Sequence, residues 1–198
     1  LGLQVRLDLH AHNDRGMGAA NVLAAARTGI DVIHCTVMGI GERSGNTPLE
    51  LSMVNLKMAG YWPGDITDLP GYCKEVLQSM GLGIHSHYPV LGDNAFLTQA
   101  GLHASAIRKA ESRGDEAMAG QIYSAVDPKM IGLDYRVVVG PESGRSNVRF
   151  VLERAGMDAN DNTIIDRILR KAREEKRMLS TQEGTDLAAT LAADSRSA

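Results

Sequence analysis

Residues 4–12, QVRLDLHAH, alternate strictly between polar and apolar side chains. Successive side chains of a β-strand point to opposite faces, so Asp8, His10 and His12 are predicted to share one face. The other face is apolar and suited to packing against helices. A strand with charge and imidazole on one side and apolar groups on the other is typical of a barrel with helices outside and an active site in its lumen.

Two consecutive strand–loop–helix units are predicted within residues 1–60. An alanine-rich helical pattern fills residues 16–29 and stops at a glycine. Residues 31–41 are predicted to be a second, mostly buried strand, which leads into the glycine-rich loop GIGERSGN. A further helix is expected after this loop, with Thr47 as its cap and Pro48 at its first position. Strands and helices that alternate in this way predict an α/β fold.

Three regions are predicted along the chain. A closed barrel needs about eight strands and ~250 residues. We therefore expect residues 1–60 to be the carboxyl-terminal part, the last two strand–helix units, of a (β/α)8 barrel whose beginning lies outside this chain. A mostly helical α+β region should follow: residues 61–120 as a helical linker subdomain, and residues 121–198 as a small α+β subdomain with carboxyl-terminal helices and a disordered tail.

The carboxyl-terminal helices have clear sequence signals. Residues 162–178 form an amphipathic pattern, and Ser180 with Glu183 has the spacing of a capping box that starts a last short helix. The final residues, AADSRSA, are predicted to be disordered. One apolar stripe is expected on the longer helix, made of Ile164, Ile165, Ile168 and Leu169.

Composition excludes several classes of function. The net charge of −3 argues against a broad nucleic-acid surface, because phosphate binding needs a basic excess. The two cysteines, Cys35 and Cys73, are expected to be reduced thiols that fill the core. No apolar run approaches the ~20 residues that span a bilayer, and no signal peptide opens the chain. A soluble, cytoplasmic protein without membrane contact is therefore expected.

A divalent metal site is the chemistry that the first strand suggests. His10 and His12 would point into the lumen a few ångströms apart, as two ligands of one ion can. The glycine-rich loop would lie beside them, and its glycines allow close backbone approach to a ligand. Asn46 offers an oxygen to a metal or its water, while Glu42 and Arg43 bring one charge of each sign. The alternative is a hydrogen-bonded histidine pair that lines a polar groove.

Four motifs in order carry a resemblance to a known family: HAHNDRGMGAAN, GIGERSGN, LGDNAFLTQAGLHASA and YSAVDPKMIGLDYRVVVGPESGR. The sequence resembles the 2-isopropylmalate synthase, homocitrate synthase and citramalate synthase family, whose barrels also include the hydroxymethylglutaryl-CoA lyases. The resemblance covers residues 5–185. The lyases carry a cysteine in the glycine-rich loop, and its absence here favours a synthase.

The resemblance implies an acyl-CoA-dependent 2-alkylmalate synthase, which joins acetyl-CoA to a 2-oxo acid in a Claisen condensation with a divalent Zn, Mn or Mg ion. It makes His10 and His12 metal ligands, which Asn46 would support, and it has Glu42 organise the acyl-CoA. The metal would act as a Lewis acid on the 2-oxo acid. A base of near-neutral pKa must remove a methyl proton from the thioester, and histidine suits that range.

The second half of the chain is implied to serve a partner. His103 matches the family's catalytic histidine, which reaches into a neighbouring subunit's barrel, and Tyr123 matches the tyrosine that joins it there. A homo-oligomer, or a complex with a chain that supplies the rest of the barrel, is therefore expected.

The sequence also departs from the family pattern. The aspartate ligand and the arginine-containing motif of the first barrel strand lie outside it, so the chain would be an incomplete carboxyl-terminal portion or a split subunit. Arg15 and Thr98 stand where relatives carry other residues, Thr98 in place of a histidine, and would reshape the pocket. Pro141 and Glu142 replace a basic pair.

Two other functions are compatible with the residues. DLHAH is similar to the D-x-H-x-H opening of metal-dependent amidohydrolase-type hydrolases, but a helical region arrives here after only two strands. A non-catalytic partner subunit or fragment that mediates dimerisation is the second alternative. The remaining histidines are weaker candidates: HSH at residues 85–87 lies in a proline loop, and His34 fits a core or groove position better than a ligand position.

Overall fold

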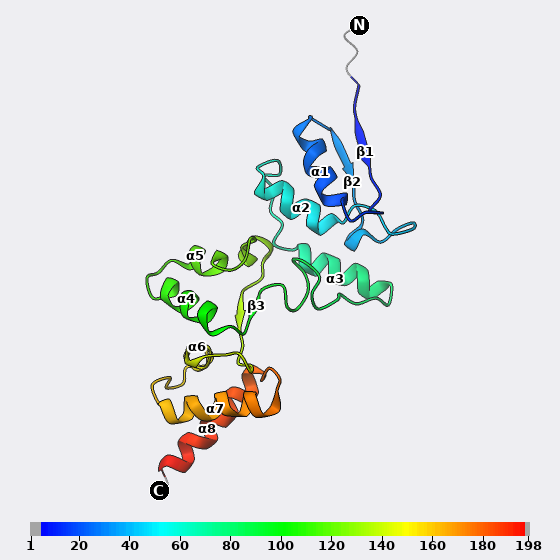
Figure 1. The fold of residues 1–198 in the computed structure, drawn as a ribbon. Coiled ribbons are helices and arrows are strands. Elements are labelled where there is room, and N and C mark those ends of the chain that lie inside the picture. The colour runs from blue at the N-terminus through cyan, green and yellow to red at the C-terminus, as the bar shows by residue number, and fades with distance from the viewer. Residues whose placement is uncertain (1–4, 197–198) are drawn as a thin grey trace. The chain divides into compact units, whose positions relative to one another are not determined.

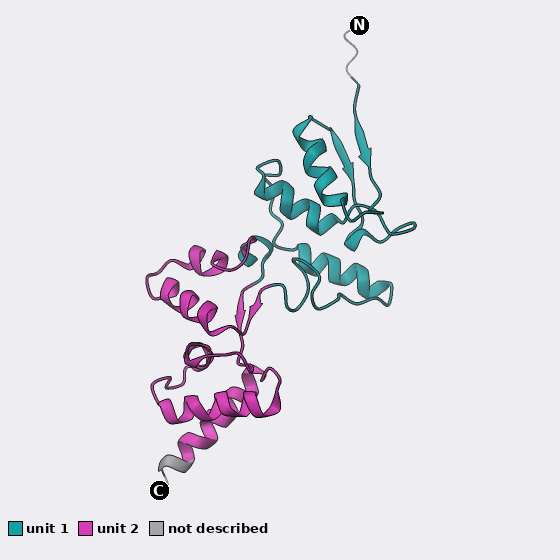
Figure 2. Ribbon diagram, in the orientation of Figure 1, with its two compact units in different colours: residues 1–95, 128–133 teal, residues 96–127, 134–198 magenta. Residues whose placement is uncertain are grey.

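The structure is a computed structural model that describes residues 5–196 (Figure 1). The chain forms two compact units: unit 1 contains residues 1–95 and 128–133, and unit 2 contains residues 96–127 and 134–198 (Figure 2). Both units combine helices with short parallel strands, which confirms the predicted mixture of helix and strand. The predicted division of the chain into three regions, with boundaries at residues 60 and 120, stays a prediction.

Unit 1 opens with a strand–helix–strand segment. Strand β1 (Asp8–His10) pairs in parallel with β2 (Val32–His34), and α1 (Gly18–Arg27) connects them (Figure 1). The register places Asp8 opposite Val32 and His10 opposite His34. Parallel neighbours need such a crossover helix, so the predicted alternation of elements is present. Regular pairing covers only Asp8–His10 and Val32–His34, so both strands are shorter than the segments predicted from the sequence.

Three further helices complete the first part of unit 1: the 3₁₀ helix η1 (Val37–Gly39), α2 (Leu49–Met58) and α3 (Leu69–Ser79). Thr47 does not cap α2, whose N-cap is Pro48. The Thr47 side chain is fully buried, and its hydroxyl donates instead to the Ala11 carbonyl at 3.3 Å. Thr47 therefore links the segment after β2 to the segment after β1 and does not cap the helix. The short 3₁₀ helix η2 (Pro128–Ile131) also belongs to unit 1.

Unit 2 contains a second parallel pair, β3 (Leu97–Thr98) with β4 (Arg136–Val137). Between them lie α4 (Gly101–Glu111) and α5 (Glu116–Gln121), which contact each other. The region from 61 to 120, predicted as helical, therefore includes one short strand. Sequence periodicity gives little warning of this strand, because only two of its residues pair.

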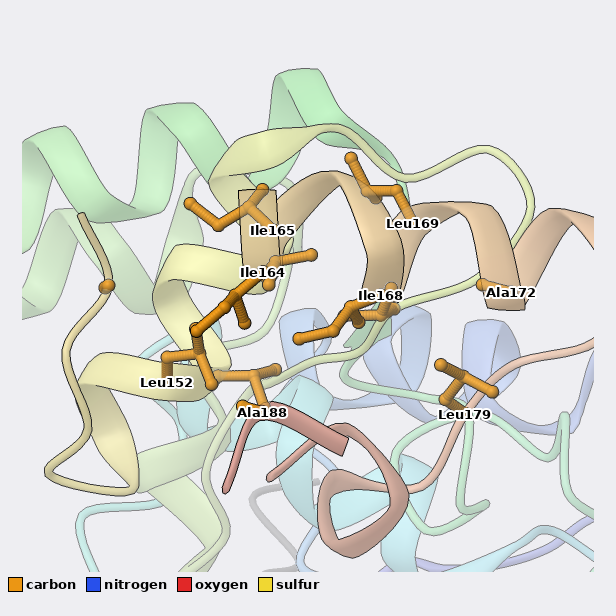
Figure 3. Close-up of a cluster of buried hydrophobic side chains, with 12 residues drawn as sticks. Leu152, Ile164, Ile165, Ile168, Leu169, Ala172, Leu179 and Ala188 are labelled. Atoms are coloured by element: carbon orange, nitrogen blue, oxygen red, sulfur yellow. The ribbon is translucent and has the colours of Figure 1, made fainter. Parts of the chain in front are cut away.

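The main core of unit 2 lies among α6 (Arg145–Arg154), α7 (Asn162–Glu175) and α8 (Thr181–Arg196), which contact one another. Figure 3 shows the predicted stripe of α7 inside this core, together with residues from α6 and α8. The four stripe residues are each at most 9% exposed, which confirms the amphipathic pattern. They are Ile164, Ile165, Ile168 and Leu169.

The capping box at the start of α8 is also confirmed. The Glu183 carboxylate accepts from the Ser180 backbone N–H at 2.8 Å, and the Glu183 N–H donates to the Ser180 hydroxyl at 3.1 Å. Arg177 and this box hold the pKa of Glu183 at about 2. Helix α8 extends to Arg196, so residues 192–196 are helical where the sequence predicted disorder. The last two residues of the predicted tail lie outside the described residues.

No helix within residues 5–196 combines the length and the apolar character that crossing a membrane requires.

Ile168 is the best site for testing the core of unit 2, because it is 1% exposed on α7. Ile168→Ala removes buried methyl groups and leaves a cavity, so we expect a loss of about 2–5 kcal/mol in the free energy of unfolding. Hydrogen exchange of the α7 amides measures this loss where it occurs. Arg167→Ala, at an exposed position on the same helix, is the matched control and should change the value by less than about 0.5 kcal/mol. Equal protection in the two variants would contradict this packing.

Candidate functional site

His10 and His12 lie close together in unit 1. Their ring centroids are 5.4 Å apart with an edge-to-face orientation. Residues two apart on an extended chain share a face, and this separation is the one that the HAH spacing predicted. His34, opposite His10 in the strand register, places its ring 5.6 Å from that of His10. The three imidazoles therefore form a row at the ends of the two parallel strands.

Asn46 joins this group through the backbone. It forms an isolated antiparallel bridge with His12, so the two residues face each other across neighbouring segments. The bridge is flanked by the hydrogen bonds from Asn13 N to Gly45 O, at 2.9 Å, and from Thr47 N to Ala11 O, at 3.2 Å. The structure thus places the His12 ring beside the His10 ring and the His12 backbone opposite that of Asn46.

Two atoms of this group are buried and have no hydrogen-bond partner: Nδ1 of His12 and Oδ1 of Asn46. Buried polar atoms are nearly always paired, so two unpaired atoms on bridged residues are consistent with a bound ligand at this place. Imidazole nitrogen and carboxamide oxygen are both donor atoms for divalent cations. The residues therefore fit a metal ion, with His10 as the adjacent imidazole.

The described residues contain no group of three or more His, Cys, Asp or Glu side chains arranged to hold a metal. Catalytic metal sites use three protein ligands as a rule. The predicted ligand set of His10, His12 and Asn46 contains two imidazoles and one carboxamide, which is a weaker set.

Three glycines allow the glycine-rich loop to pack around Asn46. A Cβ at Gly41 would collide with the Asn46 side-chain amide, and one at Gly45 would collide with the Gly39 carbonyl. Gly39 and Gly45 also have positive φ angles of 68° and 103°, which residues other than glycine rarely adopt. The loop conformation that presents Asn46 therefore requires glycine at these positions.

Glu42 and Arg43 have different surroundings. The Arg43 guanidinium forms an ion pair with Asp14, with Nε 2.9 Å from Oδ1, and it holds the pKa of that carboxyl below its usual value. This pair ties the glycine-rich loop to the turn after β1. The Glu42 side chain is 78% exposed and lies 3.9 Å from Arg43. Among the described residues it forms no hydrogen bond or ion pair with His10, His12 or Asn46.

Glu50 is a buried carboxylate that sequence reasoning missed. It is fully buried in the first turn of α2. Its Oε2 accepts from the Met38 backbone N–H at 2.9 Å, and its Oε1 accepts from the Tyr88 hydroxyl. Burial raises the pKa of Tyr88, and the bond to the carboxylate raises it further. The available signal was an acidic residue between two leucines in the segment TPLELS.

His103 and Tyr123, predicted to act together, are in direct contact within unit 2. Their rings are stacked, with centroids 3.6 Å apart and an interplanar angle of 22°. His103 lies in the first turn of α4, and Tyr123 follows α5 in the chain. The His103 Nδ1 atom is 3.0 Å from the Thr98 hydroxyl oxygen. Tyr123 is 50% exposed, so the pair lies at the surface of this unit.

The HSH segment does not have the same character as the HAH segment. The His87 backbone N–H donates to His85 Nδ1 at 3.2 Å, and Asn94 Nδ2 lies 3.2 Å from His87 Nε2. One nitrogen of each ring is therefore engaged by the loop itself. His34 lies 3.7 Å from the Asp8 carboxylate, and both are exposed. Cys35 and Cys73 are free thiols, as expected. Cys73 is buried in the core as predicted, whereas Cys35 is only partly buried.

Comparison with known proteins gives consistent relatives. The sequence model of the HMGL-like family matches residues 3–72. A 2-phosphinomethylmalate synthase of Streptomyces hygroscopicus is 37% identical over 152 residues, which cover 75% of this chain and 32% of the relative. A putative (R)-citramalate synthase of Methanopyrus kandleri is 36% identical over 173 residues, with coverages of 86% and 32%. A homocitrate synthase of Nostoc sp. is 30% identical over 186 residues, which cover 91% of this chain and 47% of the relative. The chain thus spans about a third to a half of the length of these relatives.

Cys73 provides a test of the buried environment around Glu50. Burial, reinforced by the Glu50 charge, raises the pKa of this thiol from 9.0 to about 12. Because only the thiolate reacts, we expect alkylation of Cys73 by iodoacetamide at pH 8 to be at least about a hundredfold slower in the folded chain than in urea. Its rate should keep rising with pH beyond 9, where an unperturbed thiol levels off. Peptide mass spectrometry measures both rates, and equal rates would show that the thiol is not buried as described.

Proposed function

Because this chain belongs to the family of the 2-isopropylmalate, homocitrate and citramalate synthases, we propose that it serves an acyl-CoA-dependent condensation of acetyl-CoA with a 2-oxo acid. The observation that carries the proposal is the meeting of His10, His12 and Asn46, with two unpaired buried atoms among them. A metal-assisted reaction of a chelating 2-oxo acid needs donor atoms of this kind.

The proposed architecture is the end of a (β/α)8 barrel. Its support is the parallel pairing of β1 with β2 and the helices α1 and α2 that follow them. His12 and Asn46 lie just beyond the carboxyl ends of these strands. Active sites of such barrels occupy that face, because the loops after all the strands converge there.

A divalent Zn, Mn or Mg ion would be held by His10, His12 and Asn46. When bound, it supplies Lewis-acid stabilisation of the negative charge that develops on the carbonyl oxygen of the 2-oxo acid. The chain itself positions the ligands: the backbone bridge fixes His12 against Asn46, and the ion pair of Arg43 with Asp14 fastens the loop. Glu42, exposed on that loop, would contact the acyl-CoA.

His103 and Tyr123 would act on the thioester of acetyl-CoA, in the barrel of a neighbouring subunit. The enolate forms when the methyl C–H bond breaks, which needs a base for the proton and a hydrogen-bond donor for the carbonyl oxygen. The enolate carbon then bonds to the ketone carbon of the 2-oxo acid, whose C=O π bond opens so that its oxygen takes up a proton. Water then cleaves the thioester to a carboxylate and free CoA. The stacked phenol holds the imidazole plane in one orientation. This arrangement favours an oligomer or a complex with a further chain.

Metal content tests the ligand assignment. The double variant His10→Ala with His12→Ala removes both imidazoles, so we expect retained Zn or Mn to fall at least about tenfold, as measured by elemental analysis after dialysis. The matched control is His85→Ala with His87→Ala, which removes an equal number of imidazoles from a pair already engaged by its own loop. Equal losses in the two double variants would exclude the assignment.

The proposed reaction is tested by CoA release from acetyl-CoA, using the protein as it occurs in its host cell, with any associated chain. 2-Oxo acids with small, branched and acidic side chains should include at least one that releases CoA. His103→Ala should lower kcat by about a hundredfold or more with little change in metal content. An intact oligomer that releases no CoA with any of these acids would instead favour the non-catalytic partner role.

A further inference from the structure

We propose that Thr98 is a positioning residue that holds the neutral His103 ring in its Nε2–H tautomer, so that this ring acts as a hydrogen-bond donor. The inference deepens the proposed function, and it rests on that function only for the identity of the substrate that His103 meets. Enolate formation requires a base and a hydrogen-bond donor, and the inference assigns the donor role to His103.

The hydrogen-bond roles follow from three atoms. The Ala100 backbone N–H donates to the Thr98 hydroxyl oxygen at 3.3 Å, and an amide N–H can only donate. The same oxygen lies 3.0 Å from His103 Nδ1. The Thr98 hydroxyl accepts one hydrogen from Ala100 and still has its own hydrogen, which it can donate to Nδ1. A neutral imidazole carries one N–H, so Nδ1 as acceptor places that hydrogen on Nε2.

The reverse arrangement would have His103 Nδ1–H donate to Thr98. The Thr98 hydroxyl hydrogen would then need a different acceptor. Within residues 5–196, the hydrogen bonds of the Thr98 side chain are those with Ala100 and His103. The arrangement with the hydroxyl as donor therefore satisfies all three groups at once, and the reverse leaves one hydrogen for solvent.

The segment between Thr98 and the helix that carries His103 is held by buried groups. The Gln99 carbonyl accepts from the Ser143 hydroxyl at 2.7 Å and from Asn147 Nδ2 at 3.0 Å. Asn147 is fully buried, and Ser143 is only 3% exposed. The chain on either side of Thr98 thus has little freedom to move its hydroxyl away from Nδ1.

Close packing fixes the start of α4 as well. A Cβ at Gly101 would lie 3.0 Å from the Gly144 backbone nitrogen, a tight contact, so α4 begins closely packed against residues 143–145. Tyr123 stacks on the His103 ring at 3.6 Å and restricts its rotation. With the ring plane and Nδ1 both fixed, the orientation of Nε2–H is fixed too.

An Nε2–H donor suits the thioester carbonyl. When the methyl proton leaves, negative charge grows on that oxygen, and a preorganised donor stabilises it more than it stabilises the ground state. The same Nε2 atom cannot accept a proton while it already carries one. His103 in this tautomer therefore lowers the barrier to enolate formation without being the base.

Nitrogen NMR of the ¹⁵N-labelled full chain measures the tautomer directly, at a pH where His103 is neutral. We expect the proton on Nε2 and an Nδ1 shift typical of a hydrogen-bonded acceptor. Thr98→Val keeps the shape and strand preference of the residue but removes the hydroxyl, so the Nδ1-protonated form should become detectable. Thr98→Ser should restore the wild-type spectrum. A proton on Nδ1 in the wild type, or no spectral difference between Thr98→Val and the wild type, would overturn the inference.

Kinetics supply the second measurement. In the holoenzyme, Thr98→Val should lower kcat by about tenfold or more while the KM for the 2-oxo acid stays within about twofold, because the ring donor acts on the thioester. Thr98→Ser should recover most of the lost rate. An unchanged kcat in Thr98→Val would remove the catalytic role of the bond. If the wild type released no CoA, the proposed function would fail while the NMR result still decided the tautomer.

Discussion

The backbone bridge between His12 and Asn46 is the interaction on which the candidate metal site depends. It joins the segment after β1 to the segment after β2, beyond the point where the regular strand pairing has ended. Without it, the histidines of the β1 segment and the asparagine of the glycine-rich loop would have no fixed relation. Thr47, buried and bonded to Ala11, reinforces the same junction from the next residue.

Buried polar groups have a similar organising role in both units. Glu50 in unit 1 fixes the turn at Met38, which has the left-handed φ of 50°, and it does so just before the glycine-rich loop. Ser143 and Asn147 in unit 2 hold the carbonyl of Gln99, just before the helix that carries His103. In each unit, a buried side chain satisfies backbone groups next to the exposed chemistry. The candidate site residues therefore depend on buried neighbours that hold the backbone beside them in place.

Local patterns in the sequence predicted much of this structure, and long-range contacts could not be predicted in the same way. The two-residue period placed His10 beside His12, the helical period of residues 162–175 gave the stripe of α7, and the S-x-x-E spacing gave the cap of α8. Each of these relations spans only a few residues. The bond of Glu50 to Tyr88 spans 38 residues, and the link of Gln99 to Ser143 spans 44. Neither leaves a local signal, because the partners meet only after the chain has folded.

The crowding around Asn46 bears on how such a loop changes over evolutionary time. Gly41 and Gly45 are each in contact with a neighbour that a methyl group would displace, so a single substitution at either site requires a simultaneous shift elsewhere in the loop. Single substitutions at these glycines are therefore disfavoured, and we expect the residues of this loop to be kept together or replaced together. We therefore expect the residues of this loop to stay recognisable among distant relatives, because a side chain at either glycine would collide with its neighbour.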